Sequence, residues 1–220
     1  MSAMPRGPRD SRNWYLDADP LEQVDHALVD FAAAHAGHEL LDLGCGLGGY
    51  SLELGKRGFA VRGLDVSDRY VERARSLGVE AETYDGSTLP LPDDAVDSVL
   101  MLEVIEHLDE PAALLAEARR VARRNVLLST PNATQSFGST PVEFSHMLDL
   151  DHRHAFTVAS LSELLDGVFG TSHVEQVAPV DARLAAQILP GVLRPPYRWL
   201  HRAGLAKPRF FTRLIARAPA

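Results

Sequence analysis

The chain has 220 residues, 45% of them hydrophobic and 24% charged, which is the composition of an ordinary globular protein. A single cysteine, Cys45, excludes an internal disulfide and suits a reducing, cytoplasmic compartment, and no apolar run reaches the roughly 20 residues that a membrane-spanning helix needs. The net charge of −8 is unevenly distributed: residues 182–220 hold eight cations and no acidic residue, so residues 1–181 carry −16.

Short strands and helices alternate along the predicted chain. Apolar residues three or four positions apart predict a first helix over 20–36. The strands predicted after it are 39–43, 60–64, 79–84, 96–102, 125–129, 173–177 and 210–216. The helices predicted between them run from the glycines after the first strand to about Lys56, from Ser67 to Leu77, over 111–123 and over 157–168. This alternation, with strands rich in valine and leucine, predicts a parallel sheet covered by helices on both faces.

Residues 131–156 form a long connection with no clear hydrophobic period. A connection of this length inside a compact domain is usually functional. Its second half is rich in side chains that bind metals or protons, namely His146, Asp149, Asp151, His152 and His154. We therefore expect this connection to contribute to a site.

The strongest chemical pattern is LLDLGCGLGGYS, in which a strand ends in glycines and a helix follows. Glycines at such a junction let a ligand approach bare backbone at a helix N-terminus. Gly44, Gly46 and Gly49 satisfy the dinucleotide pattern G-x-G-x-x-G, and Asp65 lies 21 residues beyond Gly44, where a carboxylate can accept both ribose hydroxyls. Asp42 decides between ligands, because a carboxylate beside the loop repels a pyrophosphate and attracts an ammonium and a sulfonium. The pattern therefore favours S-adenosylmethionine over NAD.

With these residues in place, the sequence resembles the class I S-adenosylmethionine-dependent methyltransferases, whose first motif reads much like D-L-G-C-G-x-G. The resemblance covers roughly residues 25–180. It implies an α/β fold that is Rossmann-like and doubly wound, with a mostly parallel seven-stranded sheet, an antiparallel C-terminal strand and helices on both faces. It also implies S-adenosylmethionine as the cofactor.

By the same resemblance, three regions contact the cofactor. The first lines the methionine end, the second binds the ribose and flanks the adenine, and the third, in the stretch YDGSTLPLPDDAVDSV, caps the adenine amine and passes beside the ring. Asp85 has a second interpretation, as a turn residue before Gly86. The residues assigned to the cofactor are Asp42, Gly44, Cys45, Gly46, Asp65, Val66, Asp85, Gly86, Ser87 and Glu103.

The stretch LEVIEH follows the strand predicted over 96–102 and places Glu103, Glu106 and His107 within five positions. Ligands collect outside the carboxyl ends of the strands in an open parallel sheet, which makes these residues site candidates. If a helix begins there, all three lie on one face. Three interpretations stay open. In the first, His107 is the general base for an acceptor hydroxyl or amine. In the second, the three residues hold a divalent metal together with an imidazole from the long connection. In the third, the glutamates are first-turn acids of a helix and His107 is a packed histidine.

E-x-x-E-H followed by D-H-x-x-x-x-T resembles the small-RNA 3′-terminal 2′-O-methyltransferases, in which two glutamates and two histidines hold a metal. The match gives Glu103, Glu106, His107 and His152 as candidate metal ligands. E-x-x-E-H also resembles the ubiquinone-biosynthesis O-methyltransferases and many bacterial small-molecule methyltransferases, where a metal is not general. The chain lacks the aromatic F-E-W-T of the RNA enzymes, and its acidic body offers no surface that tracks phosphates, so the sequence disfavours RNA as the acceptor.

The predicted function is transfer of the methyl group of S-adenosylmethionine to a small-molecule nucleophile, with oxygen favoured. Resemblance to methyltransferases of sugar and polysaccharide assembly suggests a sugar-linked compound or a secondary metabolite as the acceptor. The alternatives are a metal-dependent RNA ribose 2′-O-methyltransferase, an NAD-binding oxidoreductase and a non-catalytic interaction module. No nucleic-acid partner and no integral membrane segment is expected, and the sequence does not predict the oligomeric state.

Residues 1–13 carry an early positive charge without an apolar core, so we expect a mobile leader there and a single domain over 14–220. The family's sheet ends in an antiparallel pair of strands, and the segment between those strands is longer than a hairpin requires. We therefore expect a basic helical insertion over about 181–208. It is expected to cover the acceptor pocket, to pair with another subunit, to contact a lipid surface peripherally or to pack on the sheet edge.

Overall fold

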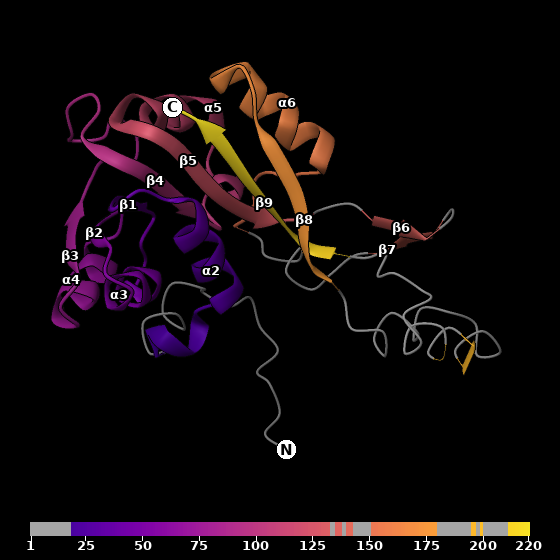
Figure 1. Ribbon diagram of the computed structural model, residues 1–220, viewed down its shortest axis with the longest axis horizontal. Helices are drawn as coiled ribbons and strands as arrows, with labels where there is room; N and C mark the ends of the chain where they lie inside the picture. The colour runs from indigo at the N-terminus through magenta and orange to yellow at the C-terminus, as the bar shows by residue number, and fades with distance from the viewer. Residues whose placement is uncertain are drawn as a thin grey trace.

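A seven-stranded sheet organises the computed structural model of the chain (Figure 1). The structure describes residues 19–132, 135–137, 140–142, 151–179, 195–196, 199 and 211–220. The strands of the sheet are β1 (Glu39–Leu43), β2 (Ala60–Asp65), β3 (Glu80–Thr83), β4 (Val96–Leu102), β5 (Ala122–Pro131), β8 (His173–Pro179) and β9 (Phe211–Pro219). Their order is β3-β2-β1-β4-β5-β9-β8, and β9 is antiparallel to both of its neighbours while the pairs from β3 to β5 are parallel. The predicted fold class is confirmed.

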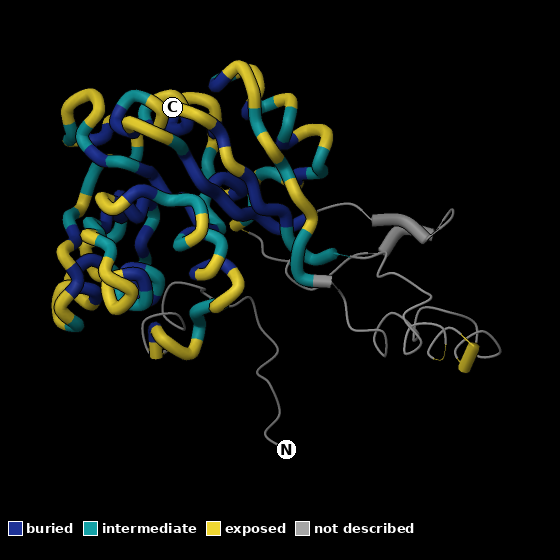
Figure 2. Tube along the Cα trace, viewed as in Figure 1, coloured by how far each residue is buried: buried dark blue, intermediate teal, exposed yellow. Residues whose placement is uncertain are grey.

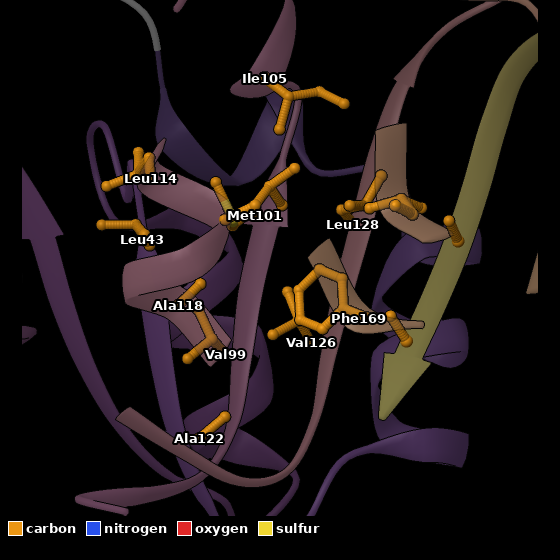
Figure 3. Close-up of a cluster of buried hydrophobic side chains, with 14 of the residues drawn as sticks. Leu43, Val99, Met101, Ile105, Leu114, Ala118, Ala122, Val126, Leu128 and Phe169 are labelled. Carbon is orange, nitrogen blue, oxygen red and sulfur yellow. The ribbon is translucent and has the colours of Figure 1, made fainter. Parts of the chain in front are cut away.

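Helices cover both faces of the sheet. They are α2 (His26–His35), α3 (Gly49–Lys56), α4 (Asp68–Ser76), α5 (Pro111–Val121) and α6 (Val158–Phe169), with short 3₁₀ turns η1 (Pro20–Gln23) and η2 (Ile105–His107). Buried side chains of α5 and α6 pack on one face of the central strands (Figure 3). Those of α2 and α3 pack on the other face, and α4 packs on β2 and β3. The result is the three-layer arrangement that a doubly wound sheet requires.

Strand β4 shows how the sheet acquires two apolar faces. Successive side chains of a strand point to opposite faces. Val99 and Met101 belong to the cluster under α5 and α6, and Leu100 and Leu102 belong to the cluster under α2 and α3. All four are buried, and the central strands form the darkest part of Figure 2. A parallel strand covered on both sides is expected to be a continuous apolar run, as VLML is.

The helix predicted over 20–36 is divided into two pieces. Asp25 adopts an extended backbone between η1 and α2, and its carboxylate accepts a hydrogen bond from Ala27 N at 2.9 Å. An aspartate that caps the first free N–H groups in this way begins a new helix. The prediction was therefore wrong about continuity, although both pieces lie inside the predicted range.

The helix predicted over 111–123 ends earlier, at Val121, and the chain enters β5 directly. Arg123 therefore lies in β5, where its guanidinium pairs with Glu39 of β1 and with Asp97 of β4, the latter at 3.0 Å. These partners hold Arg123 in the sheet. The spacing of the apolar residues in α5 could not predict these ion pairs, because both partners are distant in sequence.

The connection over 131–156 contains regular structure that the sequence did not predict. Strand β5 continues through Pro131, and Asn132 forms an isolated parallel bridge with Phe156. Two short strands, β6 (Gln135–Phe137) and β7 (Thr140–Val142), pair as an antiparallel hairpin. The two ends of the long connection therefore lie side by side at the carboxyl end of β5.

The predicted leader over 1–13 lies outside the described residues. Of the insertion predicted over 181–208, the structure describes Pro195, Pro196 and Trp199, and all three are exposed. The predictions for these segments stay predictions. Within the described part of the chain, no helix combines the length and the apolar character that crossing a bilayer demands.

Replacing Leu115 of α5 by alanine tests the packing of the helices on the sheet. Leu115 is 0% exposed, so Leu115→Ala is expected to lower the free energy of unfolding by about 2–5 kcal/mol through lost burial and the cavity left behind. Leu21→Ala removes the same atoms from a residue that is 39% exposed, and this control is expected to cost under about 1 kcal/mol. Urea unfolding followed by circular dichroism measures both losses. Equal losses would contradict the assignment of the core.

Candidate functional site

Polar side chains gather where the parallel strands end. Asp42 and Asp65 lie at the carboxyl ends of β1 and β2, Glu103 follows β4, and Thr130 lies near the end of β5. Open parallel sheets bind their ligands outside this edge. Asp42, Asp65 and Glu103, which were predicted for a site from three separate stretches of the sequence, are thus brought to one edge of the sheet.

The turn after β1 presents bare backbone at this edge. The N–H groups of Gly44 and Cys45 both donate to the Leu64 carbonyl, at 2.7 and 3.1 Å, and this tightens the turn against β2. Gly44 has φ +79°, and a Cβ atom there would lie 2.6 Å from Val104 Cγ2. A side chain at this position is excluded by both backbone strain and contact. The turn is therefore half-buried at Gly44 and Gly46, where no side chain covers the main chain beside the two carboxylates.

Asp42 is a buried carboxylate, with 2% of its surface exposed. The Ser51 hydroxyl of α3 donates to Asp42 Oδ2 at 2.5 Å. Burial raises the pKa of Asp42 to about 6, the Ser51 hydrogen bond opposes that rise, and the charge of Asp65 adds to it. A carboxylate kept out of water in this way gains most from a cationic ligand that restores the lost solvation.

Asp65 closes the same turn from the neighbouring strand. Its Oδ2 accepts from Gly46 N at 2.8 Å and its Oδ1 accepts from Ser67 N at 2.9 Å. Burial raises its pKa, and these two backbone donors oppose the rise. Each oxygen retains a second lone pair, so the fixed carboxylate can still accept two hydroxyl groups.

The thiol of Cys45 points away from this edge. A Cβ atom on Gly63 of β2 would lie 2.7 Å from Cys45 Sγ, so the thiol occupies the space that Gly63 leaves. Burial raises the pKa of this thiol, which keeps it neutral. Only the main chain of Cys45 faces the turn, and any contact with a ligand there is a backbone contact.

The turn after β3 forms the next part of the edge. Val66 is 61% exposed, and a Cβ atom on Gly86 would lie 3.2 Å from Val66 Cγ1, so the two residues face each other. Asp85 is exposed, and its Oδ1 accepts from Ser87 N, Ser87 Oγ and Thr88 N at 2.8, 2.9 and 3.0 Å. These donors lower its pKa. Asp85 thus has the turn role that the sequence left open, and its Oδ2 takes no part in these three contacts.

Two residues that the sequence did not single out hold this turn in place. Glu117 of α5 accepts from Leu89 N at 3.0 Å, and Arg120 donates to the carbonyls of Leu89 and Leu91 at 3.2 and 2.9 Å. Glu117 and Arg120 also pair with each other at 2.7 Å. The only sequence signal was the spacing of three between opposite charges on a predicted helix, which is typical of a solvated pair.

Glu103 does not begin a helix, which corrects the idea of a shared helical face. Its φ is +55°, and the turn that follows, η2, covers only three residues. Its Oε1 accepts from Ser129 Oγ at 2.6 Å and lies 3.1 Å from Arg213 Nε, and Arg213 also pairs with Asp25. Ser129 and Arg213 therefore hold the Glu103 carboxylate from β5 and β9. Sequence reasoning missed Arg213, which lies 110 positions from Glu103.

Glu106, His107 and His152 do come together. Each offers a ligand atom, and these atoms lie within 4.8 Å of one another. Glu106 is 1% exposed; its Oε2 accepts from Thr130 Oγ1 at 3.1 Å, while its Oε1 has no hydrogen-bond partner in the described part of the chain. Burial, followed by the charge of Glu103, raises the pKa of Glu106 to about 8. Three of the four predicted metal ligands therefore form a cluster, and Glu103 is not a member.

The long connection is tied to this cluster by its backbone. Arg153 N and His154 N both donate to the Glu106 carbonyl, at 2.7 and 3.1 Å, which places His152 beside His107. The two imidazole rings meet edge to face with centroids 4.7 Å apart. His107 Nδ1 lies 3.2 Å from the Asp151 carbonyl, a contact that favours the proton on Nδ1 and leaves Nε2 as the acceptor nitrogen.

Comparison with known proteins identifies a family. The family model described as a methyltransferase domain matches residues 41–130. A probable S-adenosylmethionine-dependent methyltransferase of Mycolicibacterium smegmatis is 35% identical over 179 residues, which are 74% of this chain and 67% of that protein. A ubiquinone biosynthesis O-methyltransferase of Hahella chejuensis is 32% identical over 124 residues, 51% of this chain and 52% of that protein.

Solved structures agree on the fold. An S-adenosylmethionine-dependent methyltransferase from Archaeoglobus fulgidus superposes with a TM-score of 0.67 and 17% identity, covering 94% of this chain and 99% of that one. At this identity the likeness shows the fold alone. The chain spans between 52% and 67% of the length of the first three curated relatives that it matches.

Asp42→Asn is expected to raise the stability of the ligand-free protein at neutral pH. The pKa of Asp42 rises from its ordinary 3.8 to about 6 on folding, so the ionised side chain costs about 3 kcal/mol above pH 6. This cost vanishes as the pH falls through 6 toward 4, so the gain in melting temperature should be largest at pH 8 and small at pH 4. Asp97→Asn is the control with the opposite sign, since the Glu39 N–H and then Arg123 lower the pKa of Asp97. Calorimetry at three pH values measures both; a gain for Asp42→Asn that grows toward acid would contradict the buried charge.

Proposed function

The chain belongs to the S-adenosylmethionine-dependent methyltransferase family, with S-adenosylmethionine as its cofactor, and from this premise we propose that it methylates an oxygen atom of a small molecule. The observation that carries the proposal is the pair of buried carboxylates, Asp42 and Asp65, on either side of an uncovered glycine turn. A zwitterionic sulfonium compound with a ribose fits this arrangement, and a pyrophosphate does not. The NAD-binding alternative is therefore disfavoured.

The cofactor roles proposed for individual residues follow the order of the strand ends. The turn at Gly44, Cys45 and Gly46 contributes its backbone to the methionine end of the site, and Asp42, at the end of β1, lies beside this turn. Asp65 accepts the ribose hydroxyls. The adenine lies along the surface where Val66 faces Gly86, with Asp85 and Ser87 in the adjoining turn. Glu103 completes the methionine end.

Bound S-adenosylmethionine supplies a methyl group on a sulfonium, which an oxygen nucleophile displaces in one step. The protein aligns the two reactants and takes up the proton that the nucleophile loses. We assign this task to His107, and the contact of its Nδ1 with the Asp151 carbonyl, which leaves Nε2 as the acceptor nitrogen, supports the assignment. The buried edge residues also exclude water from the reacting atoms.

A small acceptor fits the charge of the protein better than RNA does. Residues 1–181 carry −16 and include every residue assigned above to the cofactor, the general base or the metal. A surface of that sign repels a polyphosphate chain. Relatives that match about half of this chain include a ubiquinone biosynthesis O-methyltransferase and a 27-O-demethylrifamycin SV methyltransferase of Amycolatopsis mediterranei. Both names describe oxygen methylation of a small molecule.

Calorimetry with S-adenosylmethionine and S-adenosylhomocysteine tests the cofactor site. Asp65→Asn is expected to weaken binding roughly tenfold or more, because an amide accepts the ribose hydroxyls without charge assistance. Affinity for the wild type should fall as the pH drops through about 6, where Asp42 becomes neutral. Asp97→Asn, a substitution at the opposite end of the sheet, should leave the affinity unchanged. Transfer of a tritiated methyl group is then screened against phenols, sugars, lipids and RNA, and labelling of RNA alone would contradict the proposal.

A metal-assisted version of the same reaction is the second candidate, and the Glu106 cluster favours it. One carboxylate oxygen and two imidazoles form a donor set for a divalent ion. Glu106 Oε1, buried and without a hydrogen-bond partner among the described residues, is the kind of atom that a cation satisfies. The contact of His107 Nδ1 with a carbonyl is also the usual orientation of a metal-binding histidine. A divalent ion bound there would lower the pKa of a coordinated hydroxyl and orient it.

His152→Ala separates the two versions. It is expected to abolish retention of zinc or manganese, measured by mass spectrometry after dialysis, and to leave calorimetric binding of S-adenosylhomocysteine unchanged. His154→Ala is the matched control, because His154 lies two positions away and its Nε2 faces the Asp109 carbonyl instead of the cluster. Equal metal content in wild type and His152→Ala, together with turnover that survives EDTA, would leave His107 acting without a metal.

A further inference from the structure

Arg213 is an arginine held at the ligand-binding edge of the sheet. It belongs to β9, in register with Pro131 of β5 and Val177 of β8, so it stands beside the carboxyl end of β5. Its side chain is only 22% exposed. Burial of a guanidinium is costly unless charged partners surround it. Its position therefore calls for an explanation beyond a solvated surface charge.

Two carboxylates surround Arg213. Its Nε lies 3.1 Å from Glu103 Oε1, and its Nη1 pairs with Asp25 at the start of α2. The second terminal nitrogen, Nη2, takes part in neither contact. One cation and two anions leave this group with a net charge of −1. The group therefore retains a guanidinium edge for an anion and an excess carboxylate for a cation.

The group borders the uncovered glycine turn. Val104, the residue after Glu103, packs against Gly44. On the other side, the hydroxyl of Tyr50, in the first turn of α3, accepts from Asp25 N at 3.3 Å. Arg213 and Glu103 thus lie on the side of the turn that is assigned to the methionine end of the cofactor.

We propose that Arg213 and Glu103 together bind the amino-acid group of S-adenosylmethionine, with the guanidinium holding the carboxylate and Glu103 holding the ammonium. This inference rests on the proposed cofactor site. A guanidinium offers the planar fork of donors that a carboxylate fits, and a neighbouring carboxylate matches the ammonium on the same carbon. A pair of opposite charges side by side is complementary to a zwitterion.

The backbone of Glu103 supports a binding role. A non-glycine residue with a φ of +55° is strained, and such residues persist where the surrounding structure fixes them for function. Here Ser129 and Arg213 fix the side chain from β5 and β9. The strained turn thus keeps the carboxylate on Arg213 and outside the cluster of Glu106, His107 and His152.

Decarboxylated S-adenosylmethionine provides the test, because it keeps the adenosine, the sulfonium and the ammonium and lacks only the carboxylate. In calorimetry with the wild type, S-adenosylmethionine is expected to bind roughly tenfold more tightly than this analogue, although the analogue carries the greater positive charge. Arg213→Met is expected to weaken binding of S-adenosylmethionine roughly 10- to 100-fold and to leave the analogue unchanged or bound more tightly. The difference between the two ligands isolates the carboxylate contact.

Arg217→Met is the matched control. Arg217 lies four positions along β9, at the far end of the strand, and its Nη1 is 3.5 Å from His35 Nδ1. This variant should bind both ligands as the wild type does. Arg213→Lys, which keeps the charge and loses the fork, should give an intermediate loss for S-adenosylmethionine alone, and it covers the case in which the methionine variant does not fold.

Equal changes for the two ligands in the Arg213 variants, including no change in either, would overturn the inference and leave Arg213 as a link between α2 and the sheet. Equal affinity of the wild type for the two ligands would overturn it without any variant. Wild-type protein that binds neither compound would instead contradict the proposed function itself.

Discussion

The site depends on two carboxylates that parallel pairing forces together at the edge of the sheet. Leu43 of β1 stands opposite Leu64 of β2, so Asp42 and Asp65, one position on either side of this pair, lie close to the same end. The Leu64 carbonyl then accepts two N–H groups from the glycine turn. Ser51 holds the Asp42 carboxylate, and Gly46 N and Ser67 N hold that of Asp65. The two carboxylates that produce the negative potential at the turn are therefore held in fixed positions by the sheet.

Such an arrangement lowers the stability of the protein and is offset elsewhere. Burial raises the pKa of Asp42, Asp65 and Glu106, so each of them opposes folding at neutral pH. The central strands and the helices on both faces form large apolar clusters that outweigh this cost. In the proposed site, a bound cation would offset the cost of these buried charges. The leucine-rich core thus supplies the stability that the buried charges of the acidic edge remove, and ligand binding at the proposed site would add to the free energy of unfolding.

The sequence was sufficient for whatever depends on local periodicity and turn chemistry. The strands from Glu39 to Leu102 and the glycine turn follow from such patterns, the antiparallel last strand follows from the family resemblance, and the structure confirms them. What it could not supply are contacts between distant segments. Arg213 reaches Glu103 across 110 positions, and Arg123 leaves its predicted helix for partners on β1 and β4. A guanidinium has no preferred sequence distance to its carboxylate, so no spacing marks such pairs in a single sequence.

The same limit explains the stretch LEVIEH. A helical spacing placed its two glutamates and its histidine on one face, but the strained backbone at Glu103 divides them between two neighbourhoods. The Glu103 carboxylate contacts Ser129 and Arg213, whereas Glu106 accepts from Thr130 and lies with His107 beside His152. In a one-step displacement the donor and the acceptor must approach from opposite sides of one carbon atom. In the proposed function, Glu103 serves the donor and His107 serves the acceptor, so this one segment would contact both reactants. That proposal accounts for the charged side chains that follow a buried strand.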